Sequence, residues 1–277
     1  MQIKTNDNTL LNVNKVGHGP ILILIPGANG TGDIFYTTAE TLKNNFTVIT
    51  YDRRGYGKTV VPTPLPANAS DPDSNYRIDK DVDDIFALAD TFSPNEPVYL
   101  MGSSSGSIVA EKAFSKNPNH FVKVSIHESP LATVIDDGGQ FKKESAQIVQ
   151  KVLDGNFGAI SDLFVDQMHI QPLDAKMMGL ATDSKPDPAK MKSILFWLKY
   201  ESAQYTSQVI DWNIFKNNSE KVILLNGTDS TGFFPQTVNQ AISKKIDVPI
   251  TMISGGHLGY AQKPEKFADT LTDALLK

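Results

Sequence analysis

The stretch that decides the fold is Met101-Gly102-Ser103-Ser104-Ser105-Gly106-Ser107, which lies between an apolar run and an amphipathic run. The apolar run, residues 97–101, predicts a strand, and residues 105–116 predict a helix. The pattern G-x-S-x-G predicts a sharp turn between them, because its glycines let the helix pack close to the strand and leave Ser104 exposed at the tip. Gly and Ser are also common in flexible loops, so the motif becomes informative only with the rest of the chain.

Further apolar runs predict a parallel sheet that is covered by helices. Residues 21–25 are aliphatic throughout, which is typical of a strand buried on both faces. Strand and helix patterns then alternate along the first part of the chain, and this order indicates an α/β fold with parallel strands. The predicted strands are residues 9–16, 21–25, 46–51, 97–101, 121–126, 221–226 and 248–253.

The residues between the predicted strands 121–126 and 221–226 show helical periodicity and no strand pattern. We interpret residues 131–218 as an inserted helical lid, and residues 1–130 with 219–277 as the core domain. Asp187 is the expected N-cap of one lid helix, with Pro188 in its first turn. Some methionine and aromatic side chains of the lid either line an apolar pocket or only pack the lid on the sheet. These are Met168, Met177, Met178, Phe196, Trp197 and Tyr200.

Composition argues against several classes of protein. The chain of 277 residues has a formal net charge of -5 and no cluster of Lys and Arg, so no nucleic-acid partner is expected. The N-terminal residues lack the apolar core of a signal peptide, and the longest apolar run, residues 21–25, is too short for a membrane span. We therefore expect no membrane association and a cytoplasmic location. Cysteine is absent and the five histidines lack metal-ligand spacing, so we expect neither a metal nor a cofactor.

Two charged segments are interpreted as structural. Asp52, Arg53 and Arg54 follow the predicted strand 46–51, and we expect them to form ion pairs. Acidic residues at positions 79, 81, 83 and 84 begin an amphipathic helix, where the helix dipole favours them. We expect this acidic run to face solvent.

The order of polar residues along the chain indicates nucleophilic catalysis. A serine hydroxyl needs a base to take its proton, and a histidine base works better beside a carboxylate. After Ser104 come carboxylates that follow predicted strands, and then His257 in a glycine-rich loop after the last strand. Residues 26–32 form a glycine-rich loop that lacks both the ending of a P-loop and the spacing G-x-G-x-x-G. We therefore expect this loop to offer backbone N–H groups to a reaction anion, and no nucleotide site.

Nearly the whole chain resembles the α/β-hydrolase superfamily, through the loop 26–30, the turn 52–57, the elbow 102–106, the lid and His257. This resemblance implies a mostly parallel sheet of eight strands and an enzyme of the serine hydrolase type. It also implies an oxyanion hole made by the backbone N–H groups of Ser105 and Ala28, with Asn29 as the alternative to Ala28. Pro26 stands where many members have histidine, but it is not the donating residue.

Two carboxylates compete for the role of the acid that orients His257. Asp229 follows the predicted strand 221–226, which is the usual place in the superfamily, and it is preferred. Glu128 is the rival, because Ser104-Ser105-Gly106 and His127-Glu128 resemble the zearalenone-type lactone hydrolases, which use a glutamate at this place. His127 is interpreted as structural.

The expected activity is cofactor-free hydrolysis of a small, fairly apolar ester or lactone through an acyl-serine. Serine in place of aspartate at the elbow argues against dehalogenase and epoxide hydrolase chemistry. Acyl transfer, carbon-carbon bond hydrolysis and perhydrolysis are alternatives on the same triad, and so is a ligand receptor with little turnover. The sequence identifies neither the natural substrate nor the oligomeric state.

Overall fold

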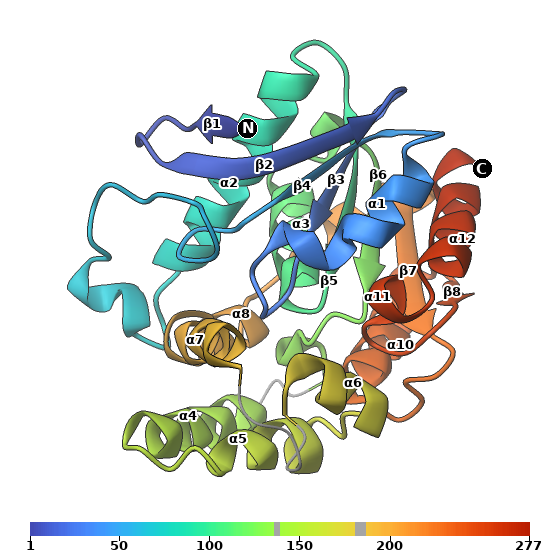
Figure 1. The fold of residues 1–277 in the computed structure, drawn as a ribbon. Helices are drawn as coiled ribbons and strands as arrows, with labels where there is room; N and C mark the ends of the chain where they lie inside the picture. The colour runs from blue at the N-terminus through green and yellow to red at the C-terminus, as the bar shows by residue number, and fades with distance from the viewer. Residues whose placement is uncertain (136–138, 181–186) are drawn as a thin grey trace.

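The structure, a computed structural model, describes residues 1–135, 139–180 and 187–277. Its centre is a sheet of eight strands in the order β1-β2-β4-β3-β5-β6-β7-β8 (Figure 1). β2 runs antiparallel to β1 and β4, and the other neighbouring strands run parallel. The prediction of an α/β fold with a mostly parallel eight-stranded sheet is confirmed. The strands are β1 (Gln2–Lys4), β2 (Leu10–Gly17), β3 (Ile21–Ile25), β4 (Thr47–Tyr51), β5 (Val98–Ser103), β6 (Phe121–His127), β7 (Val222–Gly227) and β8 (Ile250–Ile253).

The two faces of the sheet carry separate hydrophobic clusters. Along β3, Ile23 and Ile25 belong to one cluster and Leu22 and Leu24 to the other, because side chains of a strand alternate between its faces. The first face is covered by α2 (Tyr76–Phe92), α3 (Ser105–Lys116) and α10 (Phe234–Ile246), and the second by α1 (Tyr36–Leu42) and α12 (Pro264–Leu276). Both faces are therefore buried, which explains why β3 is aliphatic throughout.

The longer helices of the core, α1, α2, α3, α10 and α12, each place apolar side chains against the sheet. No helix in the described ranges is long and apolar enough to cross a membrane. The core helices are η1 (Gly32–Phe35), α1 (Tyr36–Leu42), η2 (Ala67–Ser70), α2 (Tyr76–Phe92), α3 (Ser105–Lys116), η3 (Pro118–His120), η7 (Ser219–Lys221), α10 (Phe234–Ile246), α11 (Gly259–Gln262) and α12 (Pro264–Leu276).

The residues described between β6 and β7 form helices and no strand, and several of these helices gather at one end of the sheet (Figure 1). Asp187 caps α7 as predicted, since its side chain accepts a hydrogen bond from the Ala189 N–H at 2.9 Å. Residues 136–138 and 181–186 of the predicted lid lie outside the described residues. The helices are η4 (Ala132–Val134), α4 (Gln140–Leu153), α5 (Ala159–Ser161), η5 (Asp162–Gln167), α6 (Pro172–Met178), α7 (Pro188–Trp197), η6 (Leu198–Ser202), α8 (Ala203–Thr206) and α9 (Trp212–Lys216).

The end of this helical insertion packs differently from its beginning. Side chains from α4 to η6 form a third hydrophobic cluster together with Ala28, Tyr56 and Phe233 of the core. Tyr205 and Phe215 instead lie in the cluster on one face of the sheet. The residues of the predicted lid 131–218 therefore pack in two places, most of them in the third cluster and the last ones against the sheet.

Buried ion pairs hold the loop after β4. Arg53 Nη2 lies 2.6 Å from Asp81 Oδ2, and Arg54 Nε lies 2.6 Å from Asp84 Oδ2. Asp81 and Asp84 are buried, so the expectation that the acidic run faces solvent is wrong for these two residues. The cause is that α2 turns them toward the two arginines, which compensate the cost of burying a carboxylate. Asp52 instead accepts hydrogen bonds from backbone N–H groups, including that of Gly32 at 3.1 Å.

Candidate active site

Ser104 occupies the tip of the turn between β5 and α3. Its backbone has φ 55° and ψ −129°, a strained conformation, and its N–H donates to the carbonyl oxygen of His127 at 2.9 Å. A Cβ atom on Gly102 would lie 2.3 Å from the carbonyl oxygen of Gly106, and one on Gly106 would lie 2.4 Å from that of Ile25. Both glycines are therefore needed for the close approach of α3 to β5 and β3, and the predicted turn is present.

His257 and Glu128 meet beside this turn. Glu128 follows β6 and His257 follows β8, and His257 Nδ1 lies 2.7 Å from Glu128 Oε2. Both side chains are buried, and His257 lines the same cavity as Ser104. The parallel strands thus bring Glu128 into contact with His257 and place His257 and Ser104 in the wall of one cavity.

The second oxygen of the Glu128 carboxylate has its own hydrogen-bond donors. Oε1 accepts from the Gly227 N–H at 2.8 Å, from Gln236 Nε2 at 3.1 Å and from the Ser230 hydroxyl. Burial alone would raise the pKa of Glu128, but the hydrogen bonds from His257 and Ser230 and the charges of nearby histidines lower it to about 2. The carboxylate is therefore ionised at neutral pH and its orientation is fixed.

Asp229, the preferred acid, makes no contact with His257, whereas Glu128, its rival, lies against that histidine. Its side chain is 44% exposed, with Oδ2 at 2.5 Å from Lys263 Nζ and Oδ1 accepting from the Thr228 hydroxyl at 2.7 Å. These hydrogen bonds lower the pKa of Asp229. Asp229 lies away from His257 because of the turn after β7, where its N–H donates to the Gly255 carbonyl oxygen and its side chain is directed to the surface.

His127 lies behind the site. Its Nδ1 is 3.0 Å from the Ser103 hydroxyl, and its ring stacks on that of His257 with 6.0 Å between the ring centroids. Burial lowers the pKa of His127 to about 4, so the ring is neutral at pH 7. A buried neutral ring packed against Phe267 agrees with the structural interpretation.

The loop after β3 lies directly against Ser104. A Cβ atom on Gly27 would be 2.8 Å from Ser104 Cβ, and the next residues, Ala28 and Asn29, line the cavity. Ser105 is the first residue of α3, where an N–H group has no partner within the helix. Among the described residues, neither the Ala28 N–H nor the Ser105 N–H donates a hydrogen bond to the protein. Both N–H groups are thus left without an acceptor in the protein, and Ala28 lines the cavity.

The cavity has a volume of about 470 Å³, and most of its wall is apolar. Of the side chains expected in an apolar pocket, Met168, Met177, Met178 and Trp197 line it. Phe196 and Tyr200 are not part of the cavity wall. Phe196 packs edge-on against Tyr56, with 4.9 Å between the ring centroids, and it also contacts Tyr200. The helical insertion therefore supplies a large part of the wall around Ser104 and His257.

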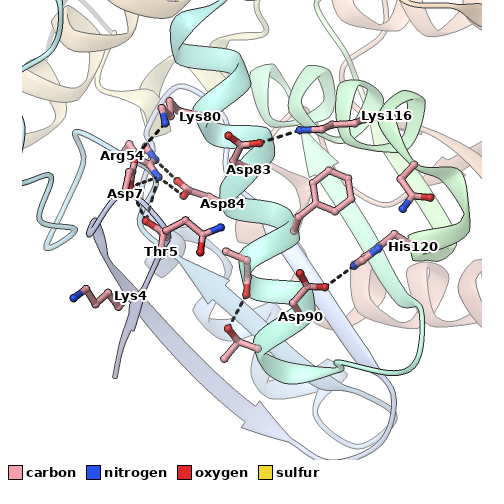
Figure 2. A pocket seen from close by; sticks show the side chains of 15 residues that line it. Lys4, Thr5, Asp7, Arg54, Lys80, Asp83, Asp84, Asp90, Lys116 and His120 are labelled. Carbon is pink, nitrogen blue, oxygen red and sulfur yellow. Dashed lines mark hydrogen bonds and ion pairs between the residues drawn. The ribbon is translucent and has the colours of Figure 1, made fainter.

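A second hollow, of about 830 Å³, lies between the start of the chain and α2 (Figure 2). Most of its polar side chains pair with one another, for example Asp83 with Lys116 and Asp90 with His120. No serine and base are placed together there among the residues that line it. Within the described ranges, no group of three or more His, Asp and Glu side chains is arranged to hold a metal ion.

Three polar residues of the site were not predicted. Ser230 and Gln236 hold Glu128, and Asp174, on α6 of the insertion, accepts hydrogen bonds from the backbone N–H groups of His257 at 3.1 Å and Leu258 at 2.9 Å. Asp174 is 83 residues from His257 in the sequence, and it belongs to no recognisable local motif. Only the folded insertion brings it to the loop after β8.

Comparisons with known proteins define the family to which this chain belongs. The family model described as alpha/beta hydrolase fold matches residues 20–264. The chain therefore belongs to the α/β-hydrolase family and is an enzyme of that family, which confirms the resemblance identified in the sequence.

Individual relatives agree with this assignment. The chain is 26% identical over 269 residues to the "Uncharacterized hydrolase YraK" of Bacillus subtilis (strain 168), with 94% of this chain and 90% of that protein covered. An alpha/beta hydrolase from Sphaerobacter thermophilus has a similar structure, with a TM-score of 0.73, 21% identity and 99% of each chain covered.

Two further solved structures are similar in fold. One is a thermophilic esterase from Thermogutta terrifontis, with a TM-score of 0.70, 16% identity and coverage of 100% of this chain and 97% of that one. The other is the enol-lactonase from Burkholderia xenovorans LB400, with a TM-score of 0.66, 14% identity and 100% of both chains covered.

Proposed function

We propose that the protein is a serine hydrolase that cleaves a small, fairly apolar carboxylic ester or lactone through an acyl-serine intermediate. The observation that carries the proposal is the 2.7 Å hydrogen bond between His257 Nδ1 and the ionised carboxylate of Glu128, with His257 and Ser104 lining one cavity. In the proposed triad Ser104 is the nucleophile, His257 the base and Glu128 the acid that orients the base.

Glu128 acts by fixing the tautomer of His257. A proton on Nδ1 is held by the carboxylate, so Nε2 keeps its lone pair and takes the proton of the Ser104 hydroxyl as Oγ attacks the substrate carbonyl carbon. The imidazolium that results is stabilised by Glu128 and returns the proton to the leaving alkoxide. A water molecule, deprotonated by His257, then attacks the acyl-serine, and the carboxylic acid leaves as Ser104 regains its proton.

The backbone N–H groups of Ser105 and Ala28 are the proposed oxyanion hole. Each is free of protein partners among the described residues; Ala28 lines the cavity, and Ser105 directly follows the nucleophile Ser104. Removing one donor from such a hole costs roughly 3 kcal/mol of transition-state stabilisation.

The size and chemistry of the cavity support the substrate class. A volume of about 470 Å³ with walls from Phe164, Met168, Trp197 and Phe233 suits a small apolar acyl or alcohol group. The helical insertion acts, in this proposal, as a lid over the substrate. The esterase and the enol-lactonase of similar fold support ester and lactone cleavage as the reactions to test first.

Hydrolysis of p-nitrophenyl acetate and p-nitrophenyl butyrate tests the proposal. The wild-type protein should release nitrophenolate over many turnovers, and Ser104→Ala should lose at least a factor of about 10³ in kcat. Ser115→Ala is the matched control, because Ser115 lies on α3 but not among the cavity residues. Equal turnover by the wild type and Ser104→Ala would refute the assigned nucleophile. Reaction of Ser104 with a fluorophosphonate but no turnover of any ester would favour a ligand receptor.

A further inference from the structure

We propose that Arg53 is a positioning residue of the oxyanion hole, which fixes the Gly27–Ala28 peptide so that the Ala28 N–H is directed to the reacting oxygen. The inference rests on the proposed function, because it assigns a task to the donor at Ala28. Arg53 does not line the cavity and follows β4, in the turn where structural ion pairs were expected.

The contact that carries the inference is made to a carbonyl group. The Gly27 carbonyl oxygen accepts hydrogen bonds from Arg53 Nη1 at 3.1 Å and from the Gly30 N–H at 3.0 Å. The Gly27 carbonyl and the Ala28 N–H belong to one planar trans peptide unit, so they point in opposite directions. A guanidinium that holds the carbonyl therefore also sets the direction of the Ala28 N–H, on the side away from Arg53.

The Arg53 guanidinium is itself rigidly held. It is fully buried, and Asp81 Oδ2 accepts from Nε at 3.1 Å and from Nη2 at 2.6 Å. Glu201 Oε2 lies 2.6 Å from the same Nη2. The planar fork of arginine presents donors to two carboxylates and to the Gly27 carbonyl at once, which the single ammonium group of lysine cannot reproduce.

Glu201 gives the helical insertion a part in this arrangement. It lies on η6, which continues directly from α7, and α7 ends with Trp197 in the wall of the cavity. Glu201 also binds Arg77 Nη2 at 3.1 Å, so its carboxylate is fixed from two sides. A continuous set of hydrogen bonds thus connects the substrate-covering insertion to the oxyanion loop through Arg53.

Arg54 supplies a matched control for Arg53. It is also buried and ion-paired, but its partners are Asp84, Asp7 and Thr5 (Figure 2), together with Thr9. Loss of a buried guanidinium at either position disturbs the packing around α2. Only the one at Arg53 is bonded to the loop 26–30.

The test compares two ligands of the same shape. An alkyl trifluoromethyl ketone adds to Ser104 Oγ and places an oxyanion in the hole, whereas the corresponding trifluoromethyl carbinol binds without forming the adduct. We expect Arg53→Lys to raise the inhibition constant of the ketone by at least about tenfold more than that of the carbinol. Removal of a whole oxyanion donor lowers kcat by about 10²–10³, and a misdirected donor should cost less than that. Arg54→Lys should change the two inhibition constants by the same factor. The proposal is overturned if Arg53→Lys, like Arg54→Lys, changes the inhibition constants of the two ligands by the same factor.

Two further variants keep the result unambiguous. If Arg53→Lys does not fold, Arg53→Met with Glu201→Met removes one charge of each sign and leaves Arg77 with Asp81, a change that buried ion pairs often tolerate. The double variant should show the same selective loss of ketone affinity. If Ser104→Ala binds the ketone as tightly as the wild type, the proposed function itself fails. If affinity depends on Ser104 but not on Arg53, only the role of Arg53 fails.

Discussion

Replacing Glu128 by glutamine gives a sharp prediction, because the surroundings of the carboxylate decide how the amide must lie. The Glu128 Oε1 position faces three donors, from Gly227, Ser230 and Gln236. An amide NH₂ group there would meet three donors, so the amide oxygen of Glu128→Gln takes this place. The NH₂ group then faces His257 Nδ1.

The consequence for His257 is a change of tautomer. A donor at Nδ1 requires the lone pair on that nitrogen, so the proton moves to Nε2, which can no longer accept the proton of Ser104. Substitution of a triad carboxylate by its amide, with the geometry intact, lowers kcat by about 10⁴ for this reason. We expect a loss of about 10³–10⁴ in kcat for Glu128→Gln with a small change in KM.

The assay is the steady-state hydrolysis of p-nitrophenyl butyrate, with the folded state checked by circular dichroism. Asp229→Asn is the control, since Asp229 bonds Lys263 at the surface and should keep kcat within a factor of about two. A Glu128→Gln variant with more than a tenth of the wild-type kcat would refute the reasoning. So would a large loss of kcat in Asp229→Asn alone.

Three other substitutions test the site and its scaffold. Gly106→Ala should lower the free energy of unfolding in urea by at least about 2 kcal/mol, because the new Cβ would lie 2.4 Å from the Ile25 carbonyl oxygen. Gly158→Ala, at a helical φ of −61°, is the control and should be neutral. The same loss of stability in both variants would contradict the packing argument. Asp174→Ala leaves the N–H groups of His257 and Leu258 without their acceptor. We expect kcat to fall about tenfold and the free energy of unfolding to fall by about 1–3 kcal/mol. An unchanged kcat would show that Asp174 does not support His257. Burial raises the pKa of Glu111 from 4.5 to about 8, so its contribution to stability is fully present below pH 4.5 and is lost as the pH rises through 8. In the wild type this loss lowers the free energy of unfolding by a few kcal/mol between about pH 5 and pH 8, and Glu111→Gln should abolish it. If the Tm of Glu111→Gln depends on pH as that of the wild type does, the prediction is wrong.

The parts of the fold that the sequence predicts well are those set by local patterns. The aliphatic run of β3 and the turn at Ser104 each carry their own signal, namely a strand buried on both faces and two glycines at fixed spacing. β1 was not predicted, because residues 2–4 form only three pairs with β2 and show no strand pattern.

The parts that could not be predicted depend on side-chain directions across the sheet. Glu128 and Asp229 each follow a strand, and the difference between them lies in the turns that direct one inward and the other to Lys263. His257 and Glu128 are 129 residues apart in the sequence, so no local spacing distinguishes the two acids. Asp81 was expected in solvent for a similar reason, because its burial depends on the distant partner Arg53.

The central claim is that Ser104 is the nucleophile of a triad with His257 and Glu128. Intact-mass analysis after treatment with a fluorophosphonate, followed by peptide mapping, tests this claim most directly. The account predicts one phosphonyl group per chain, attached to Ser104, with labelling abolished in Ser104→Ala and slowed by a factor of about 10³ in Glu128→Gln. A label on another residue, or equal labelling of Ser104→Ala, would contradict it.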